Sequence, residues 1–241
     1  MKKNFSRSGF SKIAIVGIVL GAIALGAMIV LALNHKKATE VDYSKYNFNE
    51  IIEGTEDNGN ISDHIKGNAD APVKLFEYAD YQCPGCATTN PRLNKLVEEY
   101  DGKLAVVYRN FLLSYHQNGT AAASAAEAAA LQGYWKPYAD KLFANQSSWE
   151  YADASDRTAI FIDYFEKVTE GKGDVEKFKN DMGSANVKKK IDFDMGIGKK
   201  IDVPGTPAIY LDGEWIDFSN AGTEEKFYEL LRKKIDAKLN S

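Results

Sequence analysis

The stretch Glu77-Tyr78-Ala79-Asp80-Tyr81-Gln82-Cys83-Pro84-Gly85-Cys86 decides the fold, because it holds the only two cysteines of the chain. They are spaced as C-x-x-C, which is a recognised redox spacing. Residues 73–78 form an apolar run typical of a short strand, and residues 83–100 can form a helix. The sequence therefore predicts a dithiol at a strand-to-helix turn, with Cys83 at the N-terminus of the helix.

The position of Cys83 has a chemical consequence. The unpaired amides and the positive dipole end of a helix favour a thiolate over a thiol by about 0.3 to 2 kcal/mol. We expect Cys83 to be the nucleophile, and Cys86, one helical turn further on, to resolve a mixed disulfide by attacking the Cys83 sulfur. Pro84 suits the first helical turn, where its missing N–H is no loss, and Gly85 leaves the approach to the sulfurs open.

A long apolar segment precedes this region. The chain has 241 residues, 44% of them hydrophobic, which suffices for one good-sized domain and a targeting element. Residues 13–33 are an unbroken run of 21 apolar and glycine residues. At about 1.5 Å per residue this run spans the roughly 30 Å hydrocarbon layer of a membrane. We expect a transmembrane helix there; the alternative is a cleaved signal peptide, whose apolar core is usually about 7 to 15 residues long.

The charges predict the orientation. Four basic residues precede the apolar run and two follow it closely, so residues 1–12 are expected in the cytoplasm and the catalytic domain outside. The first 37 residues contain six basic and no acidic residues; because the formal net charge of the chain is −4, residues 38–241 carry −10. An acidic domain argues against nucleic acid as a partner. The prediction is a single-pass, membrane-anchored, extracytoplasmic protein.

Two cysteines outside the cytoplasm often form one structural disulfide. A bridge across only two residues removes little chain entropy from the unfolded state, however, and would stabilise a domain of this size only weakly. A structural zinc site needs four ligands, and His35, His64 and His116 show no ligand-like spacing. Redox chemistry is therefore the favoured interpretation, with a structural disulfide as the alternative.

The rest of the chain predicts an α/β domain with a helical insertion. Residues 34–62 are polar and are interpreted as a tether, and residues 63–241 as the domain. A strand at 73–78, a helix at 83–100 and a strand at 103–111 form a βαβ unit with parallel strands. An all-helical block is expected at about 115–200, where the large aromatic side chains are interpreted as core. A hairpin of strands 208–211 and 214–218 and a helix beginning at Thr223 complete a mixed sheet flanked by helices.

With these features the chain resembles the thioredoxin superfamily, specifically the DsbA-like, membrane-anchored thiol-disulfide oxidoreductases of the BdbD type. The likeness covers about residues 60–241. Four features carry it: Gly67-Asn68-Ala69-Asp70-Ala71-Pro72 before the first strand, Phe76-Glu77-Tyr78-Ala79-Asp80 before Cys83-Pro84-Gly85-Cys86, the helical insertion, and Val203-Pro204-Gly205-Thr206-Pro207 before the hairpin.

The resemblance implies roles for further residues. Pro207 would follow a cis peptide bond and face the Cys83 sulfur, while Gly205 and Thr206 would bind the substrate, the Thr206 backbone by pairing with it as an added strand. Glu77 corresponds to the family's buried acid beneath the dithiol, a proton acceptor for Cys86. Alternation along the strand could instead place Glu77 on a solvated face.

One departure from the family pattern bears on the reduction potential of the cysteine pair. The strongest oxidants of the family have a histidine between the cysteines, whereas this chain has Pro84-Gly85. Thioredoxin and DsbA differ by about 150 mV, roughly 7 kcal/mol of differential stabilisation of the reduced form. A helix terminus supplies at most about 2 kcal/mol of that. We therefore expect the reduction potential of the Cys83–Cys86 pair to lie between those of thioredoxin and DsbA.

The favoured function is an extracytoplasmic oxidase that introduces disulfides into secreted or surface polypeptides with free thiols. The resemblance implies a quinone-linked membrane redox partner that reoxidises the Cys83–Cys86 pair. The sequence shows no metal, nucleotide or flavin motif, so the redox-active disulfide itself would carry the chemistry. Two alternatives stay open: a membrane-tethered disulfide reductase or isomerase, and a surface binding module with a structural disulfide.

Overall fold

The sheet is built around β2 (Val73–Ala79), a nearly fully buried strand. In a computed structural model, which describes residues 41–218 and 222–241, β2 pairs in parallel with β3 (Leu104–Asn110) and antiparallel with β4 (Ala208–Leu211). The edge strands are β1 (His64–Gly67) and β5 (Glu214–Trp215), which gives the order β1-β3-β2-β4-β5. The mixed sheet expected from the sequence is confirmed, with a return strand shorter than expected and with β1 as an additional strand.

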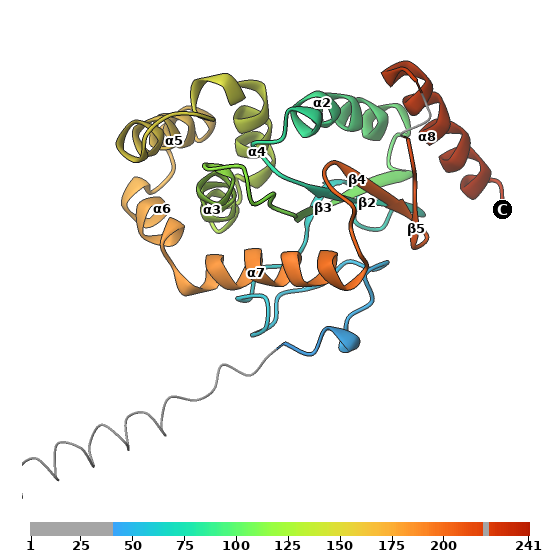
Figure 1. The fold of residues 1–241 in the computed structure, drawn as a ribbon, viewed down its shortest axis with the longest axis horizontal. Helices are drawn as coiled ribbons and strands as arrows, with labels where there is room; N and C mark the ends of the chain where they lie inside the picture. Colours follow the sequence, from blue (N-terminus) through green and yellow to red (C-terminus); the bar gives the residue numbers. More distant parts are fainter. Residues whose placement is uncertain (1–40, 219–221) are drawn as a thin grey trace, which may run out of the picture. The chain divides into compact units, whose positions relative to one another are not determined.

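Helices cover both faces of this sheet. Figure 1 shows α2 (Pro84–Glu99) and α8 (Glu224–Leu239) on one face and α7 (Ala185–Lys200) along the other. Leu93 and Leu96 of α2 and Leu231 of α8 are buried against apolar side chains of β2, β3 and β4. Burying one leucine side chain contributes about 1.5 to 3 kcal/mol, so this cluster fixes α2, and with it the two cysteines, on the sheet.

The helical insertion consists of α3 (Gly119–Ala130), α4 (Trp135–Ala144), α5 (Ala154–Val168), α6 (Val175–Met182) and α7, with a 3-10 turn η2 (Gln146–Ser148) after α4. Most of the insertion, α3 to α6, lies beside the sheet in Figure 1, whereas its last helix, α7, runs along one face. Six of the eight alanines of α3 are buried, because small side chains let the neighbouring helices approach closely. The aromatic residues of this block are core residues, as expected: Trp135, Tyr138, Phe143 and Trp149 are all buried.

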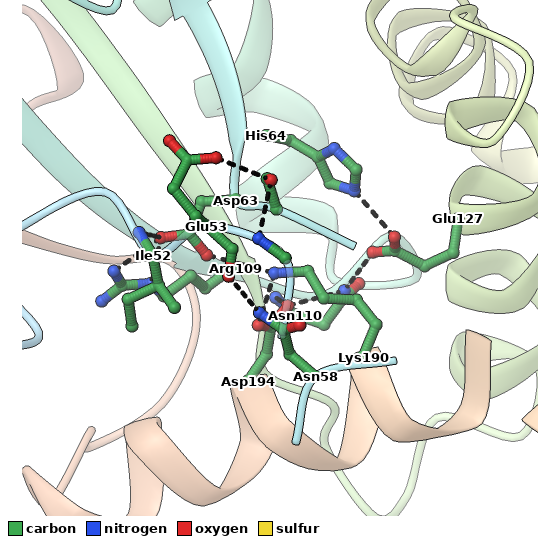
Figure 2. A network of polar contacts seen from close by, with 12 residues as sticks. Ile52, Glu53, Asn58, Asp63, His64, Arg109, Asn110, Glu127, Lys190 and Asp194 are labelled. Atoms are coloured by element: carbon green, nitrogen blue, oxygen red, sulfur yellow. Dashed lines mark hydrogen bonds and ion pairs between the residues drawn. The ribbon is translucent and has the colours of Figure 1, made fainter. Parts of the chain in front are cut away.

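The tether expected at 34–62 is wrong for residues 42–62, which belong to the same compact unit as the domain. The backbone carbonyls of Phe48 and Glu50 each accept a hydrogen bond of 2.8 Å from the buried Arg109 guanidinium. Asp63 binds Arg109 at 2.7 Å and Lys190 at 3.1 Å (Figure 2). Backbone carbonyls of the segment thus bind a buried charge, and a polar side chain such as Asn58 bonds to the backbone of the segment itself. Composition alone does not distinguish such contacts from solvation by water.

The apolar run at 13–33, the residues before it and residues 34–40 lie outside the described residues. Among the described helices, none is long and apolar enough to cross a membrane. The transmembrane helix therefore stays a prediction.

Candidate active site

The turn that carries Cys83 is held by backbone hydrogen bonds. The amide of Cys83 donates to the carbonyl oxygen of Asp80 at 3.0 Å, and the carbonyl oxygen of Cys83 accepts from the amide of Ala87 at 3.1 Å. Cys83 is the extended residue that caps α2, and Pro84 follows in the first turn. The predicted strand-to-helix turn is present, and both cysteines are free thiols in this structure.

A loop near the C-terminal end of the sequence, around Thr206 and Pro207, lies next to the Cys83 thiol. The Thr206–Pro207 peptide bond is cis, and the Cys83 thiol donates to the Thr206 carbonyl oxygen at 3.2 Å. A Cβ atom added to Gly85 would lie 3.1 Å from the Cδ atom of Pro207, so Pro207 packs against the first turn of α2. A Cβ atom added to Gly205 would meet no described atom within 4 Å. The loop therefore presents its backbone beside the sulfur with open space at Gly205.

The two thiols differ in acidity. A hydrogen bond from the Cys86 thiol, together with contacts from Thr206 and the backbone amides at the start of α2, lowers the pKa of Cys83 to about 6. Burial raises the pKa of Cys86 well above that of an ordinary thiol, and the Cys83 sulfur and the Glu77 carboxylate raise it further. At neutral pH Cys83 is therefore mainly a thiolate and Cys86 a thiol, which are the states that a nucleophile and a resolving cysteine need.

The side chain of Thr206 offers a donor to this thiolate. Its hydroxyl oxygen is buried and has no hydrogen-bond partner among the residues that the structure describes. The same hydroxyl contributes to the lowered pKa of Cys83. The thiol form of Cys83 donates to the Thr206 carbonyl oxygen. When Cys83 ionises, its sulfur has no proton to donate and becomes an acceptor, to which the Thr206 hydroxyl can donate.

Glu77 lies in the interior, so the solvated alternative is wrong. Only 1% of Glu77 is exposed, and its Oε2 atom accepts a 3.3 Å hydrogen bond from the ammonium of Lys66, which is equally buried. Its second oxygen, Oε1, has no partner among the described residues. Glu77 therefore has one oxygen bound to a cation and one free to exchange a proton. Its relay role stays a prediction.

Comparisons with known proteins agree with this geometry. The sequence model of a family described as Thioredoxin matches residues 59–237. A probable disulfide bond formation protein D of Bacillus cereus is 30% identical over 201 residues, covering 78% of this chain and 87% of that protein. The chain belongs to the thioredoxin family, in its DsbA-like branch.

Two further similarities place this thioredoxin-family chain among its relatives. The oxidised BdbD of Bacillus subtilis has the same fold, with a TM-score of 0.60 and 21% identity over 81% of this chain and 100% of that one. The Na(+)/H(+) antiporter NhaA 1 of Mycolicibacterium vanbaalenii is 32% identical over 154 residues, 63% of this chain. The chain spans about a quarter of the length of that antiporter, 23% by alignment.

Sequence reasoning missed the residues that join the thioredoxin-family turn to the helical insertion. The buried Asp80 carboxylate accepts from the amide of Leu113 at 2.9 Å and binds the His116 ring at 2.8 Å. The Gln82 side chain donates to the Glu150 carbonyl oxygen at 2.7 Å and accepts from the Asn118 amide at 2.7 Å. These contacts join positions about 30 to 70 apart, and no local pattern signals them.

The site contains a nucleophilic thiolate, a buried thiol, a buried carboxylate whose charge acts on that thiol, and an open backbone edge beside the thiolate. No group of three or more potential metal ligands occurs in the described part of the chain. Such a set of groups can exchange disulfides with an extended polypeptide.

Proposed function

We propose that this protein is an extracytoplasmic thiol-disulfide oxidase that introduces disulfides into secreted or surface polypeptides. The observation that carries the proposal is the acidity difference between Cys83 and Cys86 beside the backbone of Thr206. A pair that is stabilised as Cys83 thiolate plus Cys86 thiol favours its reduced form, and such a pair oxidises others.

The reaction begins with the oxidised pair. A client thiolate attacks the Cys83 sulfur, the bond between the two protein sulfurs breaks, and Cys86 leaves as a thiolate that takes up one proton. A second client thiolate then attacks the client sulfur of the mixed disulfide, and Cys83 leaves as a thiolate. The client loses two electrons and gains a disulfide, and the protein pair gains the two electrons.

Client binding is proposed at the cis-proline loop. Thr206 and Gly205 present backbone next to the Cys83 sulfur, and an extended client can pair with that backbone independently of its own sequence. This mode of recognition suits unfolded or partly folded polypeptides with free thiols.

The location and the electron acceptor are part of the proposal. A transmembrane helix over 13–33, with residues 1–12 in the cytoplasm, would hold the domain at the outer surface of the membrane. The reduced pair must pass its two electrons on before the next cycle, and a quinone-linked membrane protein is the acceptor that the DsbA-like resemblance implies.

One observation favours a second candidate, a reductase or isomerase. The residues between the cysteines are Pro84 and Gly85, so no histidine side chain lies between them to stabilise the thiolate. A glutathione titration separates the candidates. A potential well above about −270 mV, toward about −120 mV, supports the oxidase, whereas a value near −270 mV supports the reductase.

The deciding experiment is oxidative refolding of reduced ribonuclease by the full chain in detergent. The oxidised wild type should restore ribonuclease activity, and the Cys83→Ser and Cys86→Ser double variant should not. If the double variant replaces the wild type in a deletion strain, the binding-module alternative is correct and the oxidase proposal is wrong.

A further inference from the structure

Lys66 reaches the active site from the edge of the sheet. It lies on β1, where only 1% of its side chain is exposed, and its ammonium donates to Glu77 Oε2 at 3.3 Å. Lys66 on β1 binds Glu77, and Tyr108 on β3 is the register partner of Glu77. The Glu77 charge also acts on Cys86 of α2 and on Tyr81 in the turn before it. The β4 residue opposite is the apolar Ile209. Lys66 is the cation of this set, so its position controls the charge around Glu77.

A two-residue connection holds Lys66 in that position. Its ammonium makes a shorter hydrogen bond, 2.7 Å, to the Oδ1 atom of Asn90 on α2. The Nδ2 atom of the same amide donates to Asp140 on α4 at 2.8 Å. Because a carboxylate accepts hydrogen bonds and does not donate them, Asp140 orients the amide so that its carbonyl oxygen points at Lys66.

Asp140 connects this interior chain to the protein surface. About 30% of its side chain is exposed, and it binds Lys136 at 2.8 Å. Asn94, one turn after Asn90 on α2, also donates to Asp140, at 2.9 Å. Asn94 therefore shares the acceptor with Asn90, and the structure shows no hydrogen bond from it to Lys66 within the described residues. Both amides bind Asp140, but in the part of the chain that the structure describes only Asn90 also binds Lys66, so replacing each in turn separates the two contacts.

We propose that Asn90 and Asp140 are positioning residues that hold the Lys66 ammonium against Glu77 and thereby set how readily Cys86 exchanges its proton. The inference rests on the proposed oxidoreductase function. Cys86 is fully buried and must gain a proton when it leaves Cys83 and lose one when it attacks. Glu77 is the proposed acceptor of that proton and binds the Lys66 ammonium directly, so displacing the ammonium changes the electrostatic field at the acceptor.

The structural consequence is a link between the helical insertion and the chemistry. Asp140 belongs to the insertion, while Lys66, Glu77 and Cys86 belong to the thioredoxin part of the fold. One carboxylate of the insertion therefore orders the charges around Glu77 through Asn90 and Lys66.

The test follows two steps separately from pH 4 to 9. The reduced full chain is mixed with a fluorescent peptide that contains an internal disulfide. The Cys83 attack breaks that disulfide and forms a mixed disulfide, with the other peptide sulfur leaving as a thiolate; the Cys86 attack then breaks the mixed disulfide and releases the labelled peptide dithiol. Asn90→Leu and Asp140→Asn should slow the release step about tenfold at neutral pH, and should move the acid side of its pH profile to higher pH. Lys66→Met should do so at least as strongly. The Cys83 attack should change less than about twofold in each variant.

Asn94→Leu is the matched control and should leave both steps within about twofold of wild type. The inference is overturned if Asn90→Leu and Asn94→Leu behave alike, or if both steps slow equally in Asp140→Asn. Asp140 is partly exposed, so Asp140→Asn provides the test even if Asn90→Leu fails to fold. Ribonuclease refolding by the wild type reports separately on the proposed function, since the peptide reaction can be measured whichever way electrons flow in the cell.

Discussion

The Cys83 sulfur lies 3.2 Å from the carbonyl oxygen of Thr206, and the hydroxyl of the same threonine is buried with no hydrogen-bond partner among the described residues. One residue thus presents an acceptor to the thiol and a donor to the thiolate. The hydroxyl supplies some of the stabilisation that a histidine between the cysteines would otherwise give.

Replacing Thr206 with valine should raise the pKa of Cys83 from about 6 by up to about one unit. One unit is about 1.4 kcal/mol, so the reduction potential should fall by up to about 30 mV. Alkylation rates against pH measure the pKa, and a glutathione titration measures the potential. Thr206→Ser keeps the hydroxyl and should retain both values; a serine variant that behaves like valine would show that the hydroxyl alone does not set them.

The stability of the reduced protein should depend on pH between about 6 and 8.5. An unfolded thiol titrates near 8.5, and the pKa of folded Cys83 is lowered to about 6, so its stabilisation is complete above about 8.5 and is lost as pH falls through 6. Cys86 has a raised pKa in the folded state, so its contribution is present below about 8.5 and declines at higher pH. The melting temperature of the reduced minus the oxidised form should therefore rise from pH 6 to about 8.5 and then level or decline. A difference that does not vary with pH would contradict the ionisation of Cys83.

Glu77→Gln should slow the release of a mixed disulfide by about tenfold to a hundredfold at neutral pH, because the amide cannot accept the Cys86 proton. The attack by Cys83 should keep its rate, since the stabilising contacts of that sulfur come from Cys86, Thr206 and the helix. Stopped-flow measurement of both steps separates these effects. Equal rates of release in wild type and variant would show that Glu77 has only a packing role.

Sequence reasoning reached the features whose signals are local. The C-x-x-C turn follows an apolar strand directly, and the periodicity of residues 83–100 predicts the helix that begins at Pro84. The hairpin before α8 likewise follows from Asp212-Gly213 between two short strands.

The missed features depend on partners distant in the sequence. β1 has only four residues, one of them a lysine, and it forms by antiparallel pairing of His64 with Tyr108 on β3. Lysine side chains are mostly exposed, so a buried lysine cannot be predicted before its carboxylate partner is known. For this reason the sequence did not predict the position of Lys66 or its link through Asn90 to Asp140. The role of the segment 42–62 was missed for the same reason, because two of its backbone carbonyls accept hydrogen bonds from the buried Arg109, which is distant in the sequence.

The buried charge network beneath that segment yields a prediction about stability. Lys190 on α7 is fully buried between Asp63 at 3.1 Å and Asp194 at 2.8 Å (Figure 2), and these carboxylates raise its pKa despite the opposing effect of burial. Removing one partner of a buried ion pair leaves an uncompensated charge, so Lys190→Met should lower the free energy of unfolding by about 3 to 5 kcal/mol. The control lies on the same helix: Lys188 pairs with Asp192 at the surface, and Lys188→Met should cost about 1 kcal/mol or less. Urea denaturation measures both, and equal losses would show that the buried ion pairs of Lys190 contribute no more to stability than the surface ion pair of Lys188.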